Sequence, residues 1–209
     1  MHIELTEMLR CPETHEDSFL VMSTGEMLGR MVRSGILGCP VCRKEYPIVR
    51  GVVNFSGRGM RDAGGVVPAG PPHPASRIPH PADPQTLQAL LDLSGPGGYV
   101  VLVGSAARHA VKLAGLMGGI HFVGINPPPE VEELPVLSLL ACATLIPLRD
   151  AVARAVVVGA DAPPTPWLGE ARRVLLRGRR LVVEDERATP PAGVTRLAAG
   201  EGLWVGEKQ

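Results

Sequence analysis

From residue 83 to the last residue, short apolar runs alternate with amphipathic stretches, and this alternation restricts the possible folds more than any other feature. A short continuous apolar run is typical of a strand buried on both faces, and a longer amphipathic stretch favours a helix. Strands that alternate with helices form a parallel sheet with right-handed crossovers. The expected strands are 99–103, 120–125, 143–146, 155–158 and 180–183, and the expected helices are 84–93, 105–117, 130–141 and 166–177. Two final runs, 194–198 and 203–205, are predicted to form a hairpin that adds an antiparallel edge.

The first 56 residues contain three of the four cysteines and form a second, smaller unit. Cys39 and Cys42 lie in a CPVC sequence. Two thiolates at this spacing in a tight turn can face one ion, while turn amides donate to the sulfurs. Because a structural zinc ion takes four ligands, Cys11 is the natural third and His15 the best candidate for the fourth. These four residues are the predicted zinc site.

Other arrangements of this cysteine unit stay open. Thr14 stands where a CxxC knuckle would have its second cysteine, and CxxxH is a less common first knuckle. A unit that has lost its metal and packs Cys11 as a small hydrophobic residue is the alternative. His2 and Asp17 are poorer candidates for the fourth ligand. A redox role for CPVC is not favoured, because Cys39 does not open a helix in a βαβ unit.

Between the two units, residues 57–82 are rich in glycine and proline and show no apolar periodicity. Such a composition predicts an extended linker. The expected organisation is therefore a cysteine module over 1–56, a linker over 57–82 and an α/β domain over 83–209.

Charge and hydropathy exclude several classes of function. The chain has 21 basic and 21 acidic residues, which argues against a protein held to nucleic acid by bulk charge alone. No apolar run reaches the roughly 18 residues that a membrane-spanning helix needs. The first residues also lack the apolar segment of a signal peptide. We therefore expect no membrane span and a cytoplasmic location, where cysteines more often bind metal than form disulfides.

The cysteine module resembles the Trm112-like zinc-ribbon family. The resemblance rests on LTEMLRCPET at its start and CPVCRKEYPIVRGVVNF at its end, and it covers about 56 residues. The second motif matches the family's closing pattern through Tyr46, Pro47, Ile48, Arg50, Gly51 and 52–55. The resemblance implies a small β module that either activates a methyltransferase partner or is fused ahead of a methyltransferase domain. The single cysteine of the first knuckle departs from the ribbon with four cysteines.

The rest of the chain resembles class I S-adenosylmethionine-dependent methyltransferases. TLIPLRDAVARAVVVG is similar to the family's run into its fourth strand, and WLGEARRVLLRGRRLVVED is similar to its next helix, turn and fifth strand. YVVLVGS corresponds to the first strand. The resemblance implies an α/β, Rossmann-type domain with a mostly parallel sheet and a C-terminal antiparallel hairpin.

The same resemblance indicates where S-adenosylmethionine would bind. In this fold the cofactor lies across the carboxyl ends of the first strands. Gly104, Ser105 and Ala106 would form the turn after the first strand, Asn126 would end the second, and Asp150 is a polar candidate for the cleft. The family has two or three glycines in this turn and a carboxylate where Asn126 stands. The family's acidic residue near the adenine is replaced by the neutral stretch ACATLIP.

The loss of these features together favours a non-catalytic methyltransferase relative, a pseudoenzyme, for which no catalytic residue is assigned. The sequence predicts a binding or scaffold protein that docks a protein partner or a larger complex. An active methyltransferase on RNA, protein or a small molecule is one alternative, and an RNA-binding accessory module is another. The arginines of EARRVLLRGRR could contact RNA phosphates, although a solvated helix face is favoured.

Overall fold

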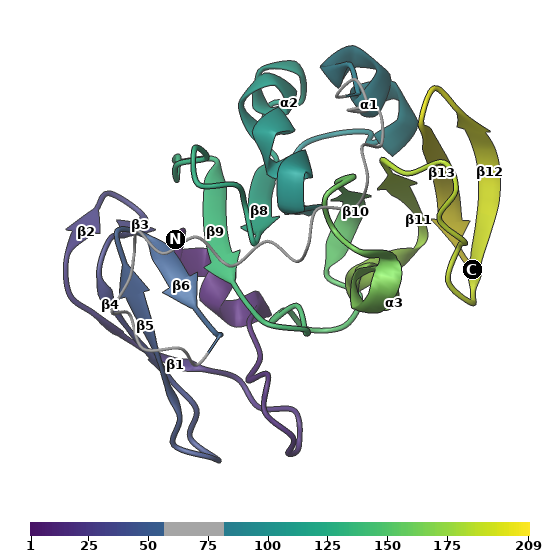
Figure 1. Cartoon of the computed structure of the whole chain (residues 1–209). Helices are drawn as coiled ribbons and strands as arrows, with labels where there is room; N and C mark the ends of the chain where they lie inside the picture. Colours follow the sequence, from purple (N-terminus) through teal and green to yellow (C-terminus); the bar gives the residue numbers. More distant parts are fainter. Residues whose placement is uncertain (57–81) are drawn as a thin grey trace.

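A computed structural model describes residues 1–56 and 82–209. The predicted linker therefore lies outside the described residues, except for Ala82. Within the described residues, one sheet of eleven strands runs through the molecule in the order β1-β4-β5-β6-β9-β8-β7-β10-β11-β13-β12 (Figure 1). Two short strands, β2 (Met27–Leu28) and β3 (Met31–Val32), form a separate antiparallel sheet.

The N-terminal strands are antiparallel and follow the 3-10 helix η1 (Ile3–Met8). We call residues 1–56 the ribbon. Its strands in the large sheet are β1 (Val21–Thr24), β4 (Gly35–Gly38), β5 (Glu45–Val49) and β6 (Val52–Asn54).

The middle of the sheet is parallel, and the C-terminal hairpin adds an antiparallel edge. Its strands are β7 (Tyr99–Val103), β8 (His121–Ile125), β9 (Leu137–Ala141), β10 (Ala153–Val158), β11 (Leu175–Val183), β12 (Val194–Gly200) and β13 (Leu203–Lys208). The helical segments are α1 (Pro84–Leu91), η2 (Gly104–His109), α2 (Ala110–Leu116) and α3 (Pro164–Val174). This arrangement confirms the predicted α/β fold class: a mostly parallel, Rossmann-type sheet with a C-terminal antiparallel hairpin, preceded in the chain by small antiparallel strands.

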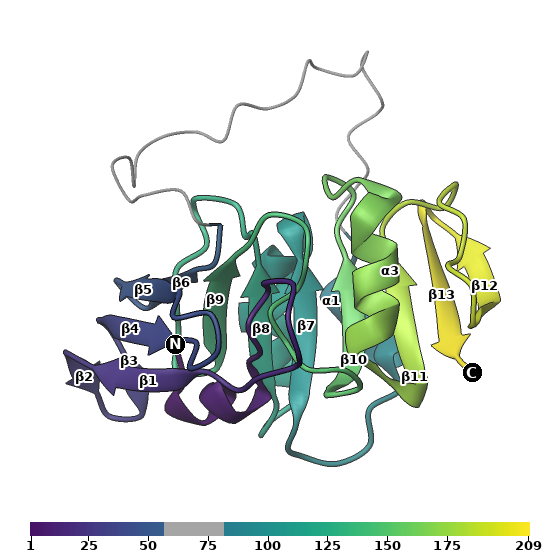
Figure 2. The ribbon, with the colours of Figure 1, turned by 90° about the horizontal axis from the view of Figure 1, so that it is seen from below.

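Alternation along the buried strands supplies a core on each face of the sheet. Val101 and Val103 of β7 pack with α3 and η1, whereas Val100 and Leu102 pack with α1 and α2. Figure 2 shows α3 and η1 in front of the sheet and α1 and α2 behind it. Because successive side chains of a strand point to opposite faces, the continuous apolar run of β7 serves both cores.

One predicted helix and one predicted strand are wrong, and the predicted helix 166–177 ends early, because β11 begins at Leu175. Residues 130–141 do not form a helix; the chain turns after β8 and enters β9 at Leu137, so the predicted strand over 143–146 falls in the following loop. Pro135, within this stretch, lacks an amide donor that a helix would use, and its ring clashes with the carbonyl four residues earlier. Residues 137–141 pair with β8 instead, through bonds such as Asn126 N–H to the Leu140 carbonyl at 2.9 Å.

The ribbon and the Rossmann-type strands share one sheet because β6 pairs with β9 in parallel. Val52 lies beside Leu139 and Val53 beside Leu140. The backbone N–H of His2 also donates to Ser138 Oγ at 2.8 Å. Leu5, Leu9, Val53 and Leu140 belong to one buried cluster. The two predicted units are therefore joined by backbone pairing and by a common core.

Candidate metal centre and cofactor edge

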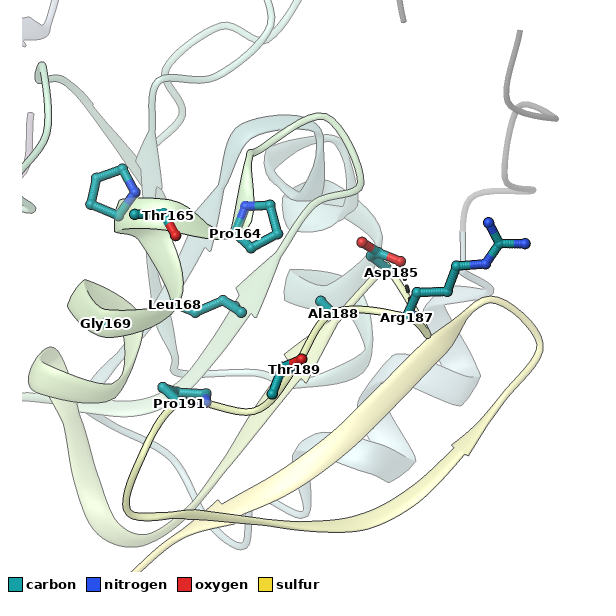
Figure 3. A pocket seen from close by; sticks show the side chains of 10 residues that line it. Pro164, Thr165, Leu168, Gly169, Asp185, Arg187, Ala188, Thr189 and Pro191 are labelled. Carbon is teal, nitrogen blue, oxygen red and sulfur yellow. Dashed lines mark hydrogen bonds between the residues drawn. The ribbon is translucent and has the colours of Figure 1, made fainter. Parts of the chain in front are cut away.

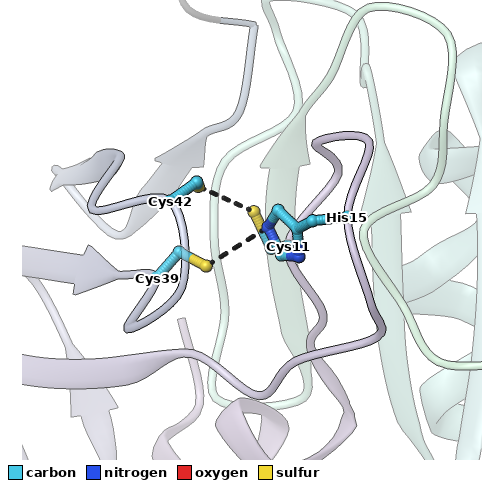
Figure 4. Close-up of side chains that lie close together, drawn as sticks. All are labelled: Cys11, His15, Cys39 and Cys42. Carbon is cyan, nitrogen blue, oxygen red and sulfur yellow. Dashed lines mark hydrogen bonds between the residues drawn. The ribbon is translucent and has the colours of Figure 1, made fainter.

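The predicted zinc ligands lie together at one end of the ribbon. The ligand atoms of Cys11, His15, Cys39 and Cys42 all lie within 4.8 Å of one another (Figure 4). The sulfurs of Cys11 and Cys42 are 3.7 Å apart, and Cys39 Sγ is 3.4 Å from His15 Nε2. Ligands about 2.0–2.3 Å from a tetrahedral zinc ion are separated by about 3.3–3.8 Å. The three thiols and the imidazole therefore fit a structural zinc ion.

Two tight turns bring these ligands together. In the second knuckle, the Arg43 N–H donates to the Cys39 carbonyl and the Cys39 N–H to the Lys44 carbonyl, each at 2.9 Å. Arg43 has φ +60°, so the knuckle passes through the left-handed region. The Lys44 ammonium lies 2.8 Å from the carboxylate of Glu13 in the first knuckle. The two turns are thus closed by backbone bonds and linked by an ion pair.

The environment of His15 leaves its Nε2 atom for an ion. His15 Nδ1 lies 2.6 Å from the Glu16 carbonyl, which can only accept, so Nδ1 carries the proton. A second bond of this kind fixes the tautomer and the ring orientation in metal-binding histidines. The alternative fourth ligands lie elsewhere: the His2 ring packs against His121 at 4.9 Å, and Asp17 is not part of the cluster.

The thiols differ in how readily they ionise. Burial raises the pKa of Cys11 to about 11, although Cys11 Sγ lies 3.2 Å from the Tyr46 hydroxyl, which favours the thiolate. Burial also acts to raise the pKa of Cys39, but the backbone amides of Cys42 and Val41 and the neighbouring thiols bring it down to about 7. A cation among these sulfurs would favour the thiolate form of all of them.

The turn after β7 is contacted by a carboxylate from the same chain. Gly104, at φ +62°, opens η2, and the backbone N–H of Ser105 donates to Asp161 Oδ1 at 2.7 Å. A Cβ atom on Gly104 would lie 2.5 Å from that oxygen. Asp161 follows β10 and was not among the predicted site residues. Its position just past the carboxyl end of a parallel strand is the signal that could have identified it.

The loop after β10 also packs tightly against this turn. A Cβ atom on Gly159 would lie 2.3 Å from Ser105 Oγ and 2.7 Å from the backbone nitrogen of Ala106. The turn that the sequence assigns to the cofactor therefore lies in direct contact with the Gly159–Asp161 loop.

We expect Gly159→Ala to lower the free energy of unfolding by about 1–3 kcal/mol, because the new methyl group meets backbone that cannot move aside easily. Gly115→Ala is the matched control, because its Cβ would meet nothing within 4 Å and it lies in α2. There we expect no loss and a gain of up to about 1 kcal/mol. Urea unfolding monitored by circular dichroism measures both. Equal effects of the two substitutions would contradict the tight contact at Gly159.

Asn126 uses its side chain to hold two loops together. It follows β8 at φ +48°. Its Nδ2 donates to the Cys142 carbonyl at 2.9 Å, and its Oδ1 accepts from the Cys142 N–H at 2.8 Å. The amide is therefore engaged with the backbone that follows β9.

Asp150 lies at the other end of the strands. It precedes β10, whereas Gly104 follows β7, and these two strands are parallel. The Asp150 carboxylate accepts from Arg173 Nη1 at 2.7 Å and lies 3.6 Å from Arg10. The structure thus brings Gly104, Ser105 and Ala106 together in one turn, but it does not bring Asp150 to them.

A buried hydrogen bond between side chains also lies at the carboxyl edge of the sheet. His109 Nε2, at the end of η2, is 2.8 Å from a carboxylate oxygen of Glu184, which follows β11. The two side chains are 8% and 10% exposed. Glu184 was not predicted, because only the fold brings it to a residue 75 positions away. The contact fixes η2 against the end of β11.

The described residues also line a cavity of about 630 Å³ beyond β10 and β11, beside the start of α3 (Figure 3). Leu168, Ala188 and Pro191 form its apolar wall, and Thr165 and Thr189 place hydroxyl groups at it. None of the predicted cofactor residues lines this cavity.

Two of the five arginines in EARRVLLRGRR are held in ion pairs. Arg173 contacts Glu170 and Asp150, and Arg180 contacts Asp92 and Glu207. Arg173 is largely buried and Arg180 lies on β11, so these two arginines hold the chain's own carboxylates and do not form a ridge for RNA phosphates.

None of the helices in the described part of the chain is long and apolar enough to cross a membrane.

Comparisons with known proteins give similarities to solved structures alone. No protein-family model matches the chain, and no curated protein matches it. Geranyl diphosphate C-methyltransferase from Streptomyces coelicolor A3(2), in complex with S-adenosyl-L-homocysteine, has a TM-score of 0.41 and 16% identity over 48% of this chain and 41% of that one. A complex that contains the Haloferax volcanii Trm112 methyltransferase activator has a TM-score of 0.40 and 21% identity, over 47% of this chain and 49% of that one. The antibiotic-resistance methyltransferase Kmr has a TM-score of 0.43 and 15% identity, over 62% of this chain and 96% of that one. The chain thus spans less than half of the length of the first two.

Proposed function

We propose that this chain is a non-catalytic, methyltransferase-like scaffold protein that holds a zinc ion in its ribbon and docks a protein partner. The observation that carries the proposal is the contact of Asp161 with the Gly104–Ser105 turn. In a cofactor-binding domain of this fold, the backbone of that turn approaches the ligand. Here the Ser105 amide is already bonded to a carboxylate of the chain itself.

The engagement of Asn126 supports the same conclusion. Its amide bonds to the backbone of Cys142 in both directions, so a ribose hydroxyl would compete with these bonds. An unmade bond to a buried polar group costs about 1–3 kcal/mol. Loss of the part-buried bonds between Asn126 and Cys142 would therefore weaken S-adenosylmethionine binding by about tenfold or more.

Zinc has a structural role in this proposal. Cys11, His15, Cys39 and Cys42 supply four protein ligands, which is the closed set of a structural site, whereas a catalytic zinc site keeps a position for water or substrate. The ion would cross-link the two knuckles and so fix the fold of the ribbon.

Titration with S-adenosylmethionine by isothermal calorimetry tests the non-catalytic assignment. We expect no saturable heat at ligand concentrations up to about 1 mM, which corresponds to a binding free energy weaker than about −4 kcal/mol. A class I methyltransferase that binds the same ligand serves as the control for ligand quality. A micromolar dissociation constant would contradict the proposal and favour the alternative of an active methyltransferase.

A further inference from the structure

The sheet ends at β1, and this edge has no partner strand among residues 1–56 and 82–209. The Gly25 N–H donates to the Ser34 carbonyl in continuation of the β1–β4 ladder. Bonded pairs alternate along an antiparallel ladder, so Val21 and Ser23 also bond to β4. The backbone N–H and C=O groups of Met22 and Thr24 therefore point to the open edge.

The two edge strands of the sheet, β1 and β12, differ in how they are protected against pairing with another chain. Proteins usually blunt an edge strand with charges, proline or a bulge, because an open edge pairs with other chains. The β12 edge has an irregularity in register between Arg196 and Ala198 and carries a charged side chain there. The β1 strand, VMST, pairs in continuous register and has neither a charge nor a proline. Its backbone is thus free to accept another strand.

The outer face beside this edge is apolar. Residues that are directly opposite in a ladder share a face, so Val21 shares one with Gly38 and Ser23 shares it with Ile36. Val21 is 55% exposed and Ile36 is 42% exposed. Phe19, two residues before Val21, is 58% exposed. We call Phe19, Val21 and Ile36 the β1 face.

Carboxylates that have no ion pair among the described residues surround this edge. Glu16 and Asp17 precede β1 in the sequence, and Glu26 follows it. Glu45 pairs with Gly38, which in turn pairs with Val21, so Glu45 lies on the same face of the sheet as Val21. Among the described residues, the cations of the ribbon without an ion pair are Arg43 and Arg50, in the turns at the two ends of β5, two strands away from β1. The segments that directly flank β1 therefore carry carboxylates and no cation.

We infer that β1 accepts an extended segment of another protein as an additional strand, and that this segment alternates apolar and basic side chains. Main-chain bonds to Met22 and Thr24 would supply affinity, and alternate side chains would contact the β1 face and the carboxylates. A second copy of this chain does not fit, because pairing two β1 strands would bring two acidic rims together. The inference rests on the proposed scaffold function and names the partner's chemistry.

Two capped, dye-labelled peptides of equal length test this, one alternating lysine and valine and the other alternating glutamate and valine. Fluorescence anisotropy with the full-length, zinc-loaded protein at low salt measures their affinities. We expect the lysine peptide to bind at least about tenfold more tightly than the glutamate peptide. Hydrogen exchange should show new protection of the Met22 and Thr24 amides in its complex.

A matched pair of charge reversals separates the β1 edge from general attraction to acidic surface. Glu26→Lys should weaken binding of the lysine peptide by about three- to tenfold at low salt. Glu201→Lys, in the turn between β12 and β13 and also next to a glycine, should leave the affinity unchanged.

Three results would each overturn the inference. The first is equal affinity for the two peptides or equal weakening by the two reversals. The second is binding without protection of Met22 and Thr24. The third is self-association through β1 in sedimentation experiments, which would make a second copy the occupant. Failure here leaves the S-adenosylmethionine titration unaffected, and a positive titration leaves the peptide result unaffected, so the two proposals fail separately.

Discussion

Replacement of Cys39 by serine is expected to abolish tight zinc binding and to lower the melting temperature of the entire protein. Cys39 is buried and is one of the four predicted ligands. Serine cannot replace a soft thiolate at a zinc ion. Zinc that binds the folded ribbon much more tightly than the unfolded chain adds to folding stability, by an amount that rises with the free zinc concentration. Zinc content by mass spectrometry and melting by calorimetry measure the two effects.

Cys142→Ser is the matched control for that substitution. Cys142 is also buried, and burial raises its pKa to about 12, but its sulfur is not part of the ligand cluster. This variant should keep one zinc ion per chain. A wild-type protein without zinc, or a Cys39→Ser protein that retains it with unchanged affinity, would show that the module packs Cys11 and Cys39 as small hydrophobic residues instead. His15→Ala then tests the fourth ligand by the same zinc measurement.

Leu140→Ala should lower the free energy of unfolding by about 2–5 kcal/mol, the usual range for a leucine truncated in a core. Leu140 is fully buried and lies in β9 between Val53 of the ribbon and Ile125 of β8. The same loss of free energy of unfolding should be measured for the ribbon and for the Rossmann-type part, because the two share this core. Tryptophan fluorescence from Trp167 and Trp204 reports on the Rossmann-type part, and the thiolate absorption of cobalt bound in place of zinc reports on the ribbon.

Leu197→Ala provides the comparison, because Leu197 on β12 is half exposed. Its truncation should change stability by no more than about 0.5 kcal/mol. If the cobalt and fluorescence transitions of Leu140→Ala separate, the ribbon and the parallel strands unfold as independent units, and the shared core is weaker than the structure indicates.

The sequence alone predicts correctly the elements whose structure is decided by their local pattern. β7 matches the predicted strand at both ends, because an apolar run bounded by Gly98 and Gly104 leaves little choice. Residues 130–141 have helical spacing, but Pro135 interrupts the helix that this spacing favours. Residues 137–141 are an apolar run that suits either element, and only pairing with β8 and β6 decides in favour of a strand.

The candidate sites likewise contain residues that local spacing predicts and contacts that only the complete fold creates. The spacing of cysteine and histidine predicted which four side chains lie together at the proposed metal site, because each of the two knuckles is a local structure. Asp161 could not be paired with Ser105 from the sequence, since 56 positions separate them. The bond from Asn126 to Cys142 depends on how the ends of β8 and β9 come together. Contacts of this kind become visible only when distant loops meet at one edge of the sheet.

The parallel pairing of β6 with β9 limits how this sequence can change. Insertion or deletion of one residue within Leu137–Ala141 would turn the following side chains of that strand to the opposite face. Leu139 and Leu140 belong to cores on opposite faces of the sheet. Such a change would therefore disturb both cores and also the pairing of the ribbon strand β6 with β9. Natural variants should therefore keep the length of this strand fixed, and substitutions in β6 and β9 should occur in concert.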